Sequence, residues 1–133
     1  MTRLATIALY AQMVLLTLGA VLFLSQQDPL AAAEPARSRQ TAGFFLGFAL
    51  VLLLLVVRRF KSEPQWLLVP IVVTTVDGVI THVVDLAAQL GVLKIPYDPF
   101  PLPLVLDLIV VPIYILAYRE LTGARVQVSA ATR

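Results

Sequence analysis

The sequence predicts an all-α, polytopic membrane protein whose four transmembrane helices form an antiparallel bundle. Of its 133 residues, 59% are hydrophobic and 14% are charged, and the mean hydropathy is +0.90. Four stretches also approach the roughly 20 apolar residues that cross about 30 Å of hydrocarbon. This composition excludes a soluble nucleic-acid-binding domain, and the absence of cysteine excludes disulfides and cysteine-ligated metals.

The predicted spans cover residues 4–24, 41–57, 66–90 and 101–118. Residues 1–121 therefore form a single transmembrane domain, and residues 122–133 are expected to be a disordered cytoplasmic tail. An alternative treats the first span as a signal peptide cleaved near Ala31–Ala33. The sequence favours a retained span, because an apolar run of 21 residues is longer than the core of such a signal, which has about 7 to 15 residues.

Basic residues in the links predict the orientation. Seven of them fall on one side of the predicted spans and three on the other. Because basic residues are enriched on the cytoplasmic side, we expect both termini in the cytoplasm and the protein in the plasma (inner) membrane. The first group is Arg3, Arg58, Arg59, Lys61, Arg119, Arg125 and Arg133, and the second is Arg37, Arg39 and Lys94.

The outer link before the fourth span is rich in proline. Pro96, Pro99, Pro101 and Pro103 fall within eight residues. Each proline fixes φ, so this pattern predicts a stiff connection, with Pro101 or Pro103 in the first helical turn. Pro112 lies inside the fourth span, where it removes a backbone donor and favours a kink.

Gly43 and Gly47 form a G-x-x-x-G pair in the second span. Small residues at this spacing let helix backbones approach closely. The pair predicts helix packing, either within the chain or in a homodimer.

The polar residues of the third span lie on one face of the helix. At 100° per residue they occupy an arc of about 160°, and aliphatic residues fill the rest. One face therefore meets lipid and the other meets protein or water. The candidate site residues on the polar face are Asp77, Thr81, His82 and Asp85, and the face also carries Thr74, Thr75, Gly78 and Gln89.

The fourth span carries a narrower polar stripe of Asp107, Tyr114 and Tyr118. Asp85 and Asp107 each lie six residues from the outer end of their span, so both are expected about 9 Å below the outer boundary. Asp77 is expected about 12 Å deeper than Asp85.

The first span adds a weaker stripe of Thr6, Tyr10 and Thr17, whereas Gln12 falls on another face. The polar stripes of the first, third and fourth spans are expected to converge on one interior.

Intramembrane aspartates are costly. Each opposes insertion by about 2.5 to 3.5 kcal/mol at the centre of a span, so they are functional candidates by default. Protonation, access to water, pairing with His82 and hydrogen bonds from Tyr114, Thr81 or Thr74 are the available compensations.

Three classes of function fit these residues. The favoured class binds or translocates a small or cationic ligand or protons through Asp77, Asp85 and Asp107. An accessory subunit of a larger membrane complex is the second. The third is an enzyme, in which paired aspartates or His82 with Asp85 act as acid and base on a lipid or a membrane peptide.

The expected partners are the lipid bilayer and a second copy or a larger complex. No nucleic acid and no cofactor are predicted. A metal shared by His82, Asp85 and Asp107 is a weaker alternative, because the sequence has a single histidine.

Two short motifs bear on the enzymatic alternative. Val83-Val84-Asp85 resembles the third-span aspartate motif of lipoprotein signal peptidases, and Phe100-Pro101 followed by Asp107 resembles the region of that family's fourth-span aspartate. The resemblance covers about 25 residues and implies that Asp85 and Asp107 activate water together. Val105 and Leu106 stand where the family has asparagine and alanine, and the family's asparagine-glycine motif in the second span is absent.

Overall fold

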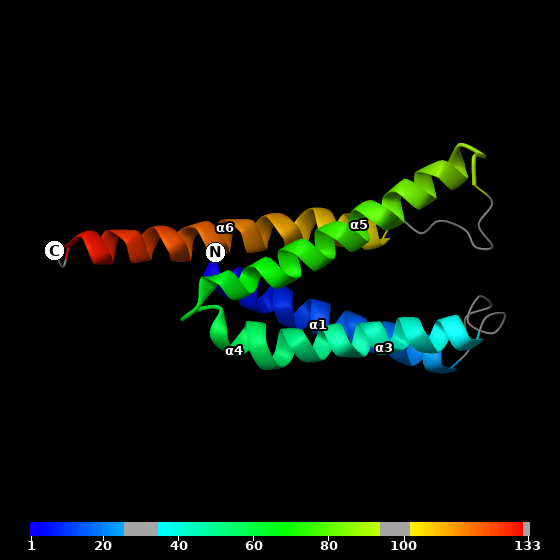
Figure 1. Cartoon of the computed structure of the whole chain (residues 1–133), viewed down its shortest axis with the longest axis horizontal. Helices are drawn as coiled ribbons and strands as arrows, with labels where there is room; N and C mark the ends of the chain where they lie inside the picture. The colour runs from blue at the N-terminus through cyan, green and yellow to red at the C-terminus, as the bar shows by residue number, and fades with distance from the viewer. Residues whose placement is uncertain (26–34, 94–101, 132–133) are drawn as a thin grey trace.

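A computed structural model describes residues 1–25, 35–93 and 102–131, and every regular element within these ranges is a helix (Figure 1). The prediction of an all-α chain is confirmed. The elements are α1 (Thr2–Ser25), α3 (Pro35–Val51), the π-helical turn η1 (Leu52–Val56), α4 (Val57–Arg59), the 3-10 turn η2 (Pro64–Leu67), α5 (Leu68–Gln89) and α6 (Leu102–Ala131).

Two described segments are long and apolar enough to cross a membrane, Thr2–Ser25 and Ser38–Arg59. They coincide with the first two predicted spans, which supports association with a membrane. The second segment is continuous although it passes through α3, η1 and α4.

Helix α3 begins earlier than expected. The sequence predicted a span from Thr41, but the helix starts at Pro35. Proline suits the first helical turn because it has no N–H to satisfy there. The hydroxyl of Ser38 also donates to the carbonyl of Phe23 at 2.7 Å, which ties this turn to the end of α1.

Helix α6 continues to Ala131, whereas residues 122–133 were expected to be a disordered tail. In the structure, residues 122–131 are helical. The segment after Leu121 contains no proline, and most of its residues tolerate a helix, so nothing ends the helix at the predicted boundary. The Thr122 hydroxyl bonds back to the carbonyl of Tyr118 at 2.8 Å, within the same helix.

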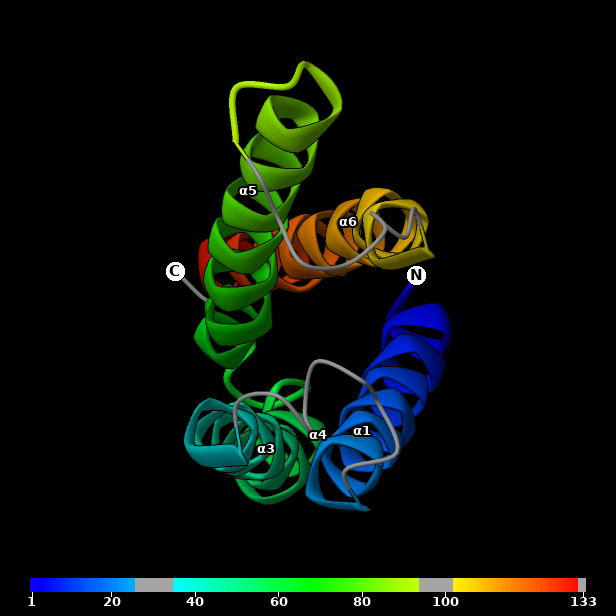
Figure 2. The ribbon, with the colours of Figure 1, turned by 90° about the vertical axis from the view of Figure 1, so that its right-hand side faces the viewer.

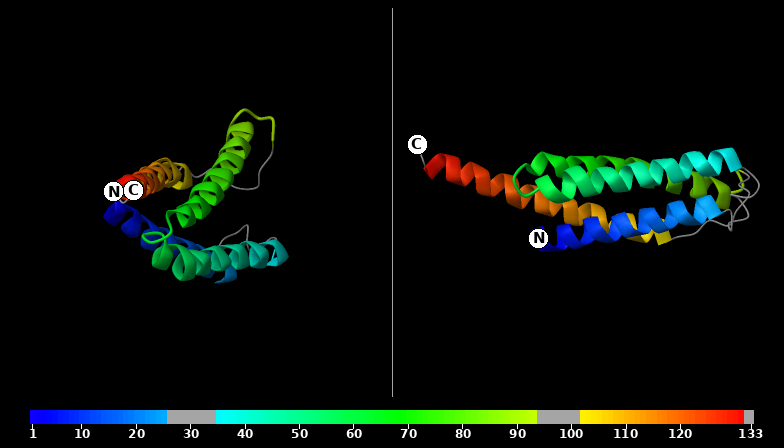
Figure 3. Two further views of the ribbon diagram at one scale, coloured as in Figure 1. Left: turned by 60° about the vertical axis from the view of Figure 1, so that its left-hand side comes forward. Right: turned by 90° about the horizontal axis from the view of Figure 1, so that it is seen from below.

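The helices form two antiparallel hairpins. Helix α1 lies along α3, and α5 lies along α6 (Figures 1 and 2). The hairpins meet at the end where α1 contacts α6 and η1 contacts η2. They diverge toward the opposite end, as Figure 3 also shows. A buried apolar cluster holds the meeting end together: Ala5, Leu9, Phe48, Leu52, Val56, Phe60, Leu67, Tyr114 and Ala117.

The turn η1 contributes to this cluster. The N–H of Val57 bonds to the carbonyl of Leu52, which is the spacing of a π-helix. One extra residue is thereby accommodated while both Leu52 and Val56 remain fully buried. The π turn therefore keeps two aliphatic side chains in the core across an irregular part of the helix.

Candidate functional site

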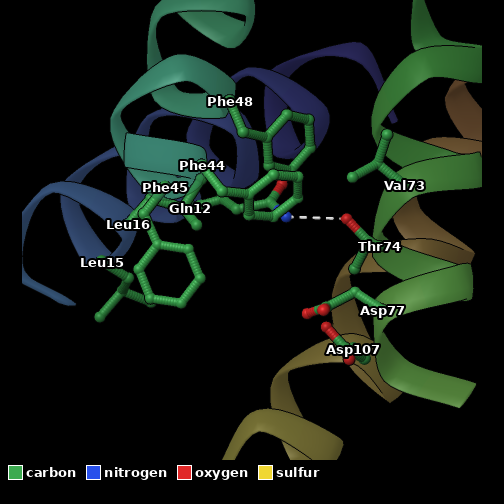
Figure 4. Close-up of a pocket in the computed structure, with 10 residues that line it drawn as sticks. All are labelled: Gln12, Leu15, Leu16, Phe44, Phe45, Phe48, Val73, Thr74, Asp77 and Asp107. Carbon is green, nitrogen blue, oxygen red and sulfur yellow. Dashed lines mark hydrogen bonds between the residues drawn. The ribbon is translucent and has the colours of Figure 1, made fainter. Parts of the chain in front are cut away.

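A cavity of about 210 Å³ lies between the two hairpins (Figure 4). Its two sides differ in chemistry. Apart from Gln12, the lining side chains of α1 and α3 are apolar, and apart from Val73, those of α5 and α6 carry oxygen atoms. The lining residues are Gln12, Leu15, Leu16, Phe44, Phe45, Phe48, Val73, Thr74, Asp77 and Asp107.

Gln12 connects three helices at the cavity. The buried hydroxyl of Tyr114 on α6 donates to Gln12 Oε1 at 2.8 Å. Gln12 Nε2 in turn donates to the hydroxyl of Thr74 on α5 at 2.8 Å. Tyr114 is 0% exposed and Thr74 is 4% exposed, so water cannot replace these partners easily. The amide of Gln12 therefore satisfies two buried hydroxyl-bearing side chains at once.

Asp107 lies directly against the backbone of α5 at Gly78. A Cβ added to Gly78 would be 2.5 Å from Asp107 Oδ2 and 3.3 Å from its Cγ. The glycine therefore leaves room for the carboxyl group in this position, and a larger residue would require the Asp107 side chain to shift. Figure 4 shows the carboxyl groups of Asp77 and Asp107 directed toward one another from the two helices. The site thus gathers two acidic side chains from two helices on one wall of the cavity.

Three phenylalanines of α3 form an aromatic wall, which we define as Phe44, Phe45 and Phe48. The Phe45 ring meets Phe23 edge to face, with centroids 5.8 Å apart. A Cβ at Gly19 would be 3.1 Å from the Phe45 ring, so this glycine admits the ring against α1. The position of Phe45 is therefore fixed from two sides by α1.

Of the predicted site residues, Asp77 and Asp107 line the cavity, and Tyr114 reaches it through Gln12. Thr81, His82 and Asp85 belong to α5, but their side chains lie outside the described residues. The prolines at positions 96, 99 and 101 also lie outside the described residues.

Asp85 and Asp107 were predicted to lie at equal depth, but the two helices place them at different heights. Asp107 lies opposite Gly78, which is next to Asp77 and seven residues from Asp85. That separation corresponds to about 10 Å along α5. The estimate assumed that both helices reach the same outer level, but α5 projects well past the start of α6 (Figure 1).

Gln12 is the residue that sequence reasoning missed, because the helical wheel placed it away from the polar stripe of α1. The stripe itself does not converge on the site. Thr6 and Thr17 donate to carbonyls of their own helix, and Tyr10 is 46% exposed. Gln12 could have been singled out because it carries an amide inside a span whose other residues are apolar or carry hydroxyl groups.

Hydrogen bonds from Tyr114 were expected to reach a carboxyl group. The structure shows the Tyr114 hydroxyl donating to Gln12 instead. Thr74, a second expected donor, accepts a hydrogen bond from Gln12.

Among the described residues, no other helix packs closely against the glycine pair Gly43 and Gly47. A Cβ at either position would meet nothing within 4 Å. The intramolecular version of the predicted helix packing is therefore wrong, and the homodimer version stays a prediction. Close approach inside the chain occurs at Gly19 and Gly78.

Among the residues that the structure describes, no group of three histidine, cysteine or acidic side chains is placed to hold a metal ion. Comparisons with protein-family models, with curated proteins and with solved structures found no match. The candidate site therefore stands on its own geometry.

Proposed function

We propose that this chain is a four-span membrane protein that binds and translocates a small cation or protons at Asp77 and Asp107. One observation carries the proposal: two acidic side chains from adjacent helices line a single cavity between two hairpins. Acidic residues inside spans are expensive and mark pathways for ions, protons or charged ligands.

The arrangement of the hairpins supports a path into this cavity. The hairpins are joined at the end that holds Phe60 and Leu67, and they diverge toward the ends of α1 and α5. By the distribution of basic residues, the diverging end is the outer one. A ligand would therefore enter from outside and reach Asp77 and Asp107 before it reaches the hydrogen bonds of Gln12. Asp85 lies on α5 toward the outer end, where it extends this path in the proposal.

The proposal is tested in liposomes that contain the purified protein. Asp77→Asn and Asp107→Asn each remove one negative charge and keep the side-chain volume. We expect either variant to lower proton or cation flux at least about tenfold, since a hydrogen bond or ion contact to a charged group contributes about 1.5 to 3 kcal/mol to binding. Flux is measured with an entrapped pH-sensitive dye and with radiolabelled methylammonium.

The matched control is Glu120→Gln, which neutralises an exposed carboxylate of α6 that pairs with the N-terminal amine at 3.2 Å. It should leave flux unchanged, because exposed ion pairs contribute little. Full flux in both aspartate variants would refute the proposal, provided that their thermal unfolding matches that of the parent chain.

A further inference from the structure

We infer that the cavity selects an organic ammonium ion with a compact apolar body, whose charged head lies at Asp77 and Asp107 and whose body lies against the aromatic wall. This inference rests on the proposed function and names the class of cation that the same site takes.

The separation of polar and apolar side chains carries the inference. Asp77 and Asp107 lie on the α5 and α6 side, whereas Phe44, Phe45 and Phe48 face them from α3 (Figure 4). A cation is attracted to carboxylates. An apolar group gains free energy when it leaves water for such a wall. A ligand with an ammonium head and an apolar body satisfies both sides of the cavity.

The volume limits the size of the ligand. An apolar cavity of about 150 Å³ holds one benzene molecule. The cavity here measures about 210 Å³, which leaves room for one ring with a short amine-bearing arm.

A bare metal ion fits the lining less well. Calcium takes about six to eight oxygen ligands and magnesium about six in octahedral geometry. Within the described part of the chain, Asp77 and Asp107 are the carboxylates of the cavity, and the amide oxygen of Gln12 already accepts from Tyr114. The aromatic wall offers a metal ion no ligand. Protons likewise gain nothing from a wall of three phenylalanines.

Two glycines position the recognition groups. Gly19 admits the Phe45 ring, and Gly78 admits the Asp107 carboxyl group. Enlarging Gly19 should displace the aromatic ring and leave the carboxyl groups in place. Gly19 is therefore a positioning residue whose substitution separates recognition of the apolar body from recognition of the charge.

The test measures binding to the full chain in lipid nanodiscs by isothermal titration calorimetry. Three probes separate charge from apolar body: 2-phenylethylammonium, its neutral counterpart 2-phenylethanol, and methylammonium. We expect 2-phenylethylammonium to bind at least about tenfold more tightly than either of the others, because each lacks one of the two recognised groups.

Variants then assign each part of the ligand to its wall. Phe45→Leu, Phe48→Leu and Gly19→Ala should weaken 2-phenylethylammonium about 2- to 10-fold, the range of a contact between two aromatic rings. They should leave methylammonium unchanged, because it has no apolar body to lie against the rings. Asp107→Asn should weaken both cations. The control Phe60→Leu makes the same substitution at a buried residue that does not line the cavity, and it should change neither affinity.

The failures are distinguishable. Equal affinity for 2-phenylethanol and 2-phenylethylammonium would overturn charge recognition. Aspartate-dependent flux of protons or methylammonium without binding of 2-phenylethylammonium would overturn this inference and leave the proposed function intact. Absence of any aspartate-dependent flux or binding would refute both.

Discussion

Gly78 is the position where one added methyl group has the clearest consequence. In the Gly78→Ala variant, the new Cβ would begin 2.5 Å from Asp107 Oδ2, so the carboxyl group or helix α6 must move. Overpacking of this kind costs about 1–3 kcal/mol of stability, whereas alanine gains about 1 kcal/mol over glycine in a helix, so the net loss is at most about 2 kcal/mol. We expect a lower midpoint of thermal unfolding, followed by circular dichroism in detergent, and a weaker affinity for methylammonium.

Gly123→Ala is the matched control, because it lies on α6 and its added Cβ meets nothing within 4 Å. A glycine in an exposed helix costs about 1 kcal/mol relative to alanine, so this variant should be equal to or more stable than the parent chain. If Gly78→Ala were as stable as Gly123→Ala and bound methylammonium equally well, the close contact with Asp107 would be disproved.

At the residue scale, part of the site could be predicted from the sequence. Asp77, Asp107 and Tyr114 were identifiable because polar side chains are rare and costly inside apolar spans. Gln12 was not, because its two partners lie 62 and 102 residues away along the chain. A helical wheel orders residues around one helix and carries no information about which neighbour each face meets.

At the scale of elements, the helices themselves were predictable and their details were not. Apolar stretches of sufficient length predicted helices close to the observed α1, α3 and α5. The uniform run from Leu50 to Val57 gave no sign of the π turn at Leu52–Val56, since every residue in it is aliphatic. The offset between α5 and α6 also escaped prediction, because it depends on how the two helices pack at Gly78.

The two hydrogen bonds of Gln12 connect α1 with α5 and α6, and they lead to a prediction at the scale of elements. Gln12→Leu should destabilise the protein by about 1–3 kcal/mol, because it leaves the buried hydroxyl of Tyr114 without its acceptor. Tyr114→Phe should also destabilise it. The double variant should cost less than the sum of the two, because each single change already breaks the same hydrogen bond.

Thermal or denaturant unfolding of the four proteins in this cycle provides the measurement. Thr17→Val is the control, since the Thr17 hydroxyl bonds only within α1, to the carbonyl of Met13, and is exposed. It should change stability by less than about 0.5 kcal/mol. Strict additivity of the Gln12 and Tyr114 substitutions would show that the two side chains do not interact.

At the scale of the whole molecule, Arg3 and the basic turn after the second predicted span lie at one end of the hairpins, whereas Arg37 and Arg39 lie near the other. The N-terminal amine pairs with Glu120 of α6, which brings Met1 beside the middle of that helix. The turn with Arg58, Arg59 and Lys61 lies at the same end of the hairpins as this pair (Figure 1). The packed arrangement thus agrees with the sorting of charges that the sequence predicted from the links alone.

This sorting predicts a topology that single cysteines can test, because the sequence contains no native cysteine to interfere. Ser62→Cys lies in the exposed turn after α4, and Arg39→Cys lies on an exposed face near the start of α3. In intact cells, a membrane-impermeant maleimide should label Arg39→Cys and leave Ser62→Cys unlabelled until the membrane is opened, since basic residues favour the cytoplasmic side. The reverse pattern would invert the orientation and place the diverging ends of the hairpins, and hence the entry to Asp77 and Asp107, on the cytoplasmic side. Labelling of both positions in intact cells would contradict a second helix that crosses the membrane between them.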